Sequence, residues 1–61
     1  MFLKEILKVI SATVPITIID GRRVELFAGR HTDIKDTLLL TYKVEKIESI
    51  ENRLTITIKE N

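Results

Sequence analysis

The sequence contains no cysteine and no tryptophan, and it has only two glycines, one proline and one histidine among 61 residues. Without cysteine the chain forms neither disulfide bonds nor thiolate metal sites. A lone histidine with no paired acidic motif argues against a metal site, so we expect no metal and no cofactor. The core of so small a domain contributes only about 3 to 5 kcal/mol, so we expect association with copies of itself or with a partner.

Long apolar runs and a strong net charge are also absent. No run approaches the roughly 18 to 20 apolar residues that a membrane span needs. Lys4, Glu5 and Lys8 interrupt the N-terminal segment, unlike the apolar stretch of a secretory signal, so we expect a cytoplasmic protein with no membrane partner. A net charge of +1 is too small to attract nucleic acid over long distances, and we expect no nucleic-acid partner.

The residues that are present suit a compact interior. Hydrophobic residues make up 44% of the chain, most of them Ile, Leu and Val, which favour strands and cores. A chain of this length is too short to divide into separate units, so residues 1–61 are expected to form a single domain.

The N-terminal segment has the spacing of a helix. Residues 2–11 place an apolar stripe opposite charged side chains, which predicts a short amphipathic helix. Pro15 has no backbone N–H to donate, so the helix is expected to end before Val14. So few residues do not hold a helix in water unaided, and the stripe must pack against a sheet.

A first pair of strands is expected next. Alternation of β-branched residues over 14–20 predicts a strand. The pattern of residues 23–28 predicts the returning strand, in which Phe27 lies on the face opposite its neighbours. Asp20-Gly21 is typical of a hairpin turn, in which Gly21 adopts a positive φ and Asp20 caps the turn.

The polar stretch over residues 29–36 predicts the main loop. Gly29 is expected at a positive φ, and Thr32 or Asp33 is expected to cap one short helical turn. Asp33 and Asp36 lack the further oxygen ligands of a calcium or magnesium loop, so capping explains them better than metal binding.

A second pair of strands follows the loop. Apolar residues alternate through Leu38, Leu40, Tyr42 and Val44 and predict a strand. The apolar phase then shifts, which indicates a β-bulge near Lys46. A turn at 51–53 leads to alternating residues over 54–58, which complete the second hairpin.

These elements predict an α+β fold, with a short N-terminal helix packed on a small, mostly antiparallel four-stranded sheet made of two β-hairpins. The helix covers one sheet face. If Ile19 and Phe27 lie on the other face, with Ile47 or Leu39 near them, they form an apolar patch that favours an oligomer interface.

Two arginine-containing stretches are the candidate ligand-binding residues. Arg22 and Arg23 precede the second expected strand, and Arg30, His31 and Thr32 follow it. Because the intervening strand spans roughly 20 Å, the two stretches meet only between protomers of a symmetric oligomer. Such a composite pocket would suit a phosphate or nucleotide, whereas the plainer interpretation is that both stretches solvate exposed loops.

Tyr42 is the remaining candidate, for contact with the ring of a ligand, although packing in the core or at an interface is the plainer interpretation. No Ser, Cys or acidic partner stands at a catalytic spacing from His31. We therefore expect no catalytic residues and no enzymatic activity.

The N-terminal FLKEILKVI, the strand ending in IIDG, the YKVEKI segment and the closing LTITI strand together resemble the small uncharacterised proteins encoded by phages and mobile elements of Gram-positive bacteria. The resemblance covers most of the chain. It implies a protein that counters host defence in the host cytoplasm.

Two functions follow as hypotheses. In the first, a homo-oligomer sequesters a nucleotide-like anionic immune signal of the host between its protomers. In the second, the chain is a protein–protein inhibitor of a host defence complex, similar to an anti-CRISPR protein, or a structural or regulatory small subunit.

Overall fold

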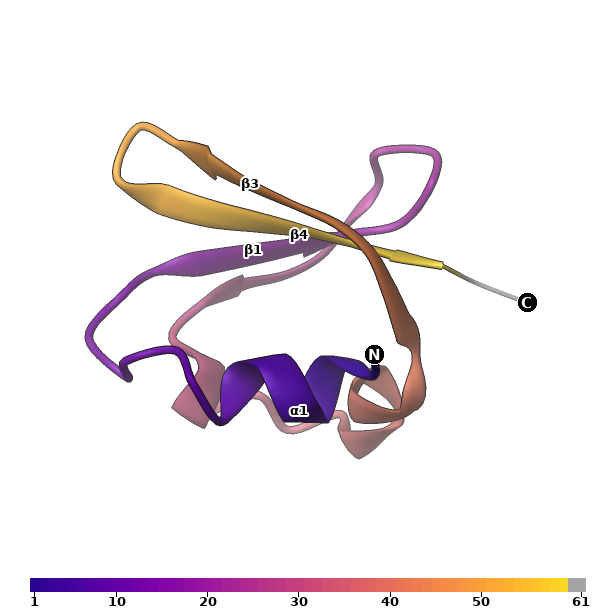
Figure 1. Ribbon diagram of the computed structural model, residues 1–61, viewed down its shortest axis with the longest axis horizontal. Coiled ribbons are helices and arrows are strands. Elements are labelled where there is room, and N and C mark those ends of the chain that lie inside the picture. The colour runs from indigo at the N-terminus through magenta and orange to yellow at the C-terminus, as the bar shows by residue number, and fades with distance from the viewer. Residues whose placement is uncertain (60–61) are drawn as a thin grey trace.

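The computed structural model describes residues 1–59 and consists of one short helix, two 3-10 helices and one four-stranded sheet (Figure 1). The elements are α1 (Leu3–Leu7), β1 (Ile16–Ile19), β2 (Glu25–Gly29), η1 (His31–Asp33), η2 (Thr37–Thr41), β3 (Lys43–Ile50) and β4 (Arg53–Lys59). The expected α+β class is confirmed. No helix within these residues is long and apolar enough to cross a membrane.

The strand order in the sheet is β2-β1-β4-β3. β1 pairs antiparallel with β2, and β3 pairs antiparallel with β4. The two central strands, β1 and β4, run parallel. The sheet is therefore mostly antiparallel with one parallel pair at its centre, and β2 and β3 are its two edges.

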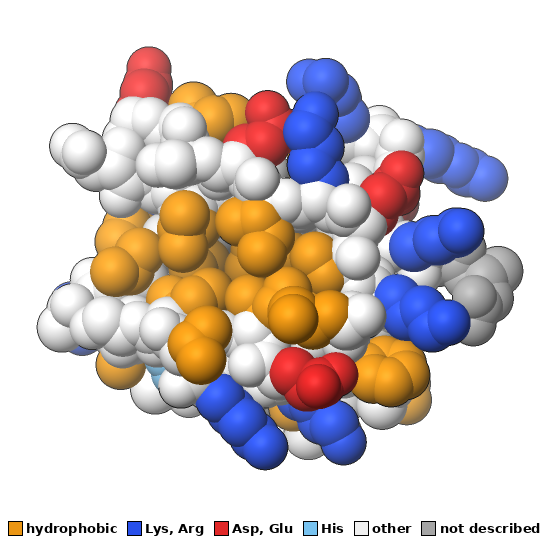
Figure 2. Space-filling model, viewed as in Figure 1, with side chains coloured by type: hydrophobic (Ala, Val, Ile, Leu, Met, Phe, Trp, Pro, Cys, Tyr) orange, Lys and Arg blue, Asp and Glu red, His pale blue; other side chains and the backbone are white. Residues whose placement is uncertain are grey.

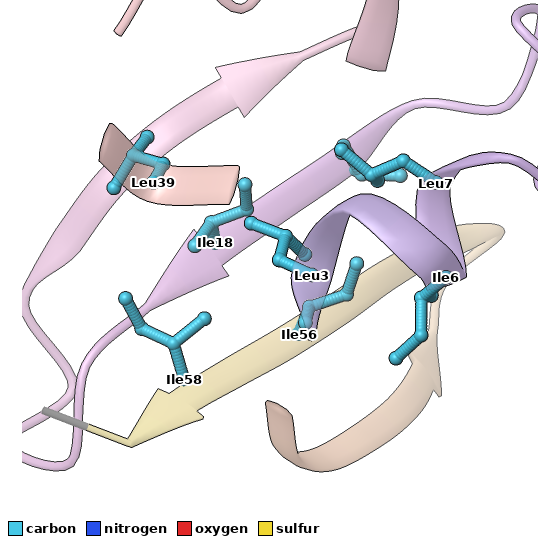
Figure 3. Packing of buried hydrophobic residues seen from close by; sticks show 8 residues of the cluster. Leu3, Ile6, Leu7, Ile18, Leu39, Ile56 and Ile58 are labelled. Carbon is cyan, nitrogen blue, oxygen red and sulfur yellow. The ribbon is translucent and has the colours of Figure 1, made fainter. Parts of the chain in front are cut away.

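The core lies between α1 and the sheet, which face one another in Figure 1. Its buried members are Leu3, Ile6, Leu7, Ile16, Ile18, Leu39, Ile56 and Ile58. Figure 3 shows Leu3 of α1 lying between Ile18 of β1 and Ile56 of β4. Strand alternation places every second residue of the central strands on this side, which is why both strands are rich in isoleucine.

The helix is shorter than the predicted range 2–11. At its start the backbone N–H of Phe2 donates to Oε1 of Glu5 over 2.9 Å, which is one half of a capping box, since the phenyl ring of Phe2 has no oxygen to accept a backbone N–H in return. It ends at Leu7, and the N–H of Val9 then donates to the carbonyl of Ile6 only three residues back. Ser11 holds the segment that follows: its Oγ accepts the N–H of Thr13, and its carbonyl accepts the N–H of Val14.

The turn between β1 and β2 differs from the prediction. Asp20 does cap it, because its Oδ1 accepts the N–H groups of Arg22 over 2.8 Å and Val24 over 3.0 Å. The positive φ lies at Arg23, at 65°, and not at Gly21. The carboxylate of Asp20 holds a wider turn than the expected two-residue type, so the left-handed residue comes later.

Two features of the second half also differ. The strand predicted from Leu38 is a 3-10 helix up to Thr41, because Oδ1 of Asp36 caps the N–H of Leu38 over 3.0 Å. Neither Thr32 nor Asp33 caps the short turn η1, since both lie inside it. The positive φ at Gly29, 142°, is confirmed. The predicted bulge near Lys46 is also confirmed, between Val44 and Lys46.

Candidate interaction surface

The predicted ligand-binding residues remain in separate places within one chain. Arg22 and Arg23 lie in the turn before β2, whereas Arg30, His31 and Thr32 follow its last residue. The five residues of β2 separate the two groups by about 17 Å at the usual rise of a strand. A single chain therefore does not bring these groups together, as the sequence indicated.

His31 and Tyr42 both have structural contacts. Nε2 of His31 lies 2.9 Å from the carbonyl oxygen of Ile10, so the half-buried ring ties the loop after β2 to the segment after α1. The carbonyl of Tyr42 accepts the N–H of Leu3 over 2.9 Å, and its side chain packs against the core. The first contact therefore holds the segment after α1, and the second holds the first residue of α1 itself.

His31 also lines a shallow hollow of about 320 Å³ beside α1. The hollow is lined by Lys4, Leu7, Lys8, His31 and Leu40. Its polar groups are all basic or neutral, and its floor is formed by leucines. The sequence pattern assigned Lys4 and Lys8 to the solvent side of the helix, and it gave no signal that they lie near His31.

Ile19 and Phe27 do not share a face, which corrects the predicted apolar patch. Phe27 pairs directly with Ile18 and packs against the core on the helix side. A register shift between Ile18 and Ile19 pairs Ile19 with Glu25. The regular alternation of faces along the β1–β2 pair is interrupted at this point, and Phe27 and Ile19 lie on opposite faces. Leu39 is also in the core, only 7% exposed.

The face away from the helix is rich in hydroxyl groups. Thr17, Thr55 and Thr57 lie on it, and Nη1 of Arg53 donates to Oγ1 of Thr17 over 3.1 Å. A groove of about 330 Å³ on this face is lined by Ile19, Asp20, Gly21, Arg23, Glu45, Lys46, Glu48, Ile50, Thr55 and Thr57. Its charges are of both signs, so the groove has no preference for an anion.

The helix side of β3 is less well covered than the rest of the sheet. Ile47 pairs with Ile56, so the two side chains lie on the same face. Ile56 is fully buried whereas Ile47 is 46% exposed, because α1 lies over the central strands. Figure 2 shows apolar side chains gathered in the gap between the sheet and α1.

The outer edge of β3 is only partly covered. Phe2 forms an isolated bridge with Lys43, and the N–H of Val44 donates to the carbonyl of Met1 over 2.9 Å. Within residues 1–59, no strand pairs with the outer edge from Glu45 to Ile50. We call residues 45–50 of β3 the open edge.

Sequence reasoning placed Ile47 with Ile19 and Phe27 and so missed the surface that it actually forms. The shift in apolar phase at the bulge was the signal that could have revealed this surface, because the bulge moves Ile47 to the helix side of the sheet.

No group of His, Asp and Glu able to hold a metal occurs in the part of the chain that the structure describes. Comparison with protein-family models, curated proteins and solved structures found no match.

Proposed function

We propose that this protein is a small binding protein that acts through contacts with another protein chain, made at the open edge of β3. The observation that supports it is Ile47, which is half exposed on the edge strand although its partner Ile56 is fully buried. An uncovered edge offers unpaired backbone groups to an incoming chain, and an apolar row beside it contributes burial.

The resemblance to small phage and mobile-element proteins implies which partner to test first. A chain of that kind acts in the host cytoplasm, and a protein of a host defence complex is then the natural target. Copies of the chain itself are the other class of partner. Both use the same edge, so one pair of variants tests the surface whichever partner binds there.

The Ile47→Lys variant is expected to lose binding of its protein partner, whereas the Ile50→Lys variant is expected to keep it. The two side chains are 46% and 49% exposed and lie on opposite faces of β3, which makes them matched positions. Burial of an isoleucine contributes about 1.5 to 3 kcal/mol, so its loss weakens binding by roughly tenfold or more. Native mass spectra of each protein, purified gently from cells with an active defence system, measure the bound partner.

Equal loss of partner in both variants, or in neither, would contradict a contact surface on the helix side of β3. Circular dichroism of each variant provides the control for folding. Because both side chains are about half exposed and neither belongs to the buried core, we expect both variants to fold like the parent protein.

The hollow beside α1 supports a second candidate function, the binding of a nucleotide-like anion. Lys4, Lys8 and His31 surround a leucine floor there, and none of the residues that line the hollow is acidic. The same native spectra report any retained small molecule as extra mass. A mass that disappears in the Lys4→Ala, Lys8→Ala double variant and remains in Lys35→Ala would support this function.

The composite site of Arg22, Arg23 and Arg30 between protomers also stays a prediction. Alanine at all three positions together removes the retained mass if that site holds the ligand, since each charge-assisted bond is worth about 1.5 to 3 kcal/mol. If neither the parent protein nor any variant retains a small molecule, contact between protein chains remains the proposed function.

A further inference from the structure

We propose that the partner at the open edge is a second copy of this chain, whose β3 pairs antiparallel with β3 so that Ile47 lies opposite the partner's Ile47. This inference rests on the proposed function, and it specifies both the occupant of the edge and the register. The free backbone groups of β3, the order of charges along it and the exposed apolar side chains beside it all fit this pairing.

The backbone of Ile47 is directed toward the open edge. Glu51 and Asn52, with φ of 49° and 64°, form a two-residue turn that makes Ile50 and Arg53 a hydrogen-bonded pair. Hydrogen-bonded and non-hydrogen-bonded pairs alternate along an antiparallel ladder. The N–H and C=O groups of Ile47 and Ser49 therefore point away from β4, where a second copy can accept and donate.

The charges beside Ile47 are complementary in this register. With Ile47 opposite the partner's Ile47, Lys46 lies opposite the partner's Glu48, and Glu48 lies opposite the partner's Lys46. Both residues lie on the face away from the helix, and within one chain Nζ of Lys46 is already 3.5 Å from Oε1 of Glu48. In the dimer, the two lysines and two glutamates lie next to one another on this face, with charges of alternating sign.

Neighbouring registers lack this complementarity. If the partner's strand slides by two residues in one direction, Lys46 lies opposite the partner's Lys46. If it slides by two residues in the other direction, Glu48 lies opposite the partner's Glu48. A shift by one residue turns Ile47 toward the polar face of the partner's sheet. The charges of β3 therefore favour one antiparallel register, in which the paired residues run from Glu45 to Ser49, because Met1 already covers the outer edge at Val44.

The apolar surface beside the edge is covered by the same arrangement. Ile47 is 46% exposed, and Phe2, which bridges to the start of β3, is 41% exposed. Figure 3 shows Ile6 of α1 on the side of the core that faces β3. A two-fold axis at Ile47 brings the apolar sides of the two copies together and supplies the burial that so small a domain lacks.

Exchange of charges between the two positions tests the pairing. Lys46→Glu alone and Glu48→Lys alone each place like charges opposite one another, and we expect dimerisation at least about tenfold weaker than in the parent protein. An equimolar mixture of the two variants restores opposite charges and is expected to form a heterodimer. The double variant Lys46→Glu, Glu48→Lys is expected to dimerise like the parent. Sedimentation equilibrium measures each association constant.

A parent protein that sediments as a monomer of 7.0 kDa at all accessible concentrations would overturn the inference. A dimer that the single charge changes do not weaken, or a mixture that does not recover association, would also overturn it. In each of these cases the Ile47→Lys and Ile50→Lys comparison still decides the proposed function, because a different protein partner uses the same edge.

A disulfide provides a second measurement that does not depend on the charge variants. The chain has no cysteine, so Ile47→Cys introduces a single thiol. Directly opposed residues lie about 5.5 Å apart between Cα atoms, which is within the range of a disulfide. Under mild oxidation Ile47→Cys is expected to form a covalent dimer and Ile50→Cys is not. Equal yields from both variants would contradict the register.

Discussion

Replacement of Ile56 by alanine is expected to leave most of the isolated chain unfolded at room temperature. Ile56 is fully buried, and it lies in β4, a central strand with a neighbour on each side. Truncation of a buried isoleucine costs about 2 to 5 kcal/mol, which is as large as the roughly 3 to 5 kcal/mol that a core of this size contributes. Urea unfolding followed by circular dichroism measures the loss.

Ile47→Ala is the matched control, because Ile47 pairs with Ile56 and the substitution removes the same atoms from the same face. The side chain of Ile47 is half exposed, so its truncation is expected to cost less than about half as much. If Ile56→Ala unfolds at the same urea concentration as Ile47→Ala, the core assigned to the central strands is wrong.

Gly29→Ala is expected to destabilise the chain by about 1 to 3 kcal/mol through the backbone. Gly29 has a φ of 142°, a conformation that residues with a side chain rarely adopt. A Cβ atom there would lie 3.5 Å from Cζ of Phe27, an ordinary contact, so the cost comes from the φ angle and not from a clash. The urea midpoint should fall while the slope of the transition stays constant.

Gly21→Ala tests the same chemistry where the backbone does not require glycine. A Cβ at Gly21 would meet nothing within 4 Å, and the positive φ in that turn belongs to Arg23. Alanine there is expected to be neutral or to stabilise by up to about 1 kcal/mol, because it restricts the unfolded chain. Equal destabilisation by the two substitutions would contradict the assigned turn geometry.

The α+β class was predictable because local patterns carry it. The apolar stripe of the first helix and the alternation in β4 are visible in short windows, and the bulge near Lys46 was visible as a change of phase. Local side-chain bonds were harder to anticipate. The carboxylate of Asp36 caps a 3-10 helix in a segment whose alternation suggested a strand.

The candidate surface depends on long-range pairing, which alternation does not encode. The parallel contact of β1 with β4 joins residues such as Ile18 and Ile56, and it leaves β3 at an edge. The face of Phe27 depends on a register shift at Ile19 that no local motif announces. Sequence patterns therefore identified apolar residues of the right kind and misjudged which of them remain exposed.

Amide hydrogen exchange at Ile47 and Ser49 tests the open edge most directly, because it needs no substitution. In a single chain both N–H groups face solvent at the edge of the sheet, and they should exchange rapidly in dilute protein. In the concentrated protein we predict slow exchange at both residues, with no change along β2. Rapid exchange at Ile47 and Ser49 at every concentration, with new protection along β2 instead, would contradict the account.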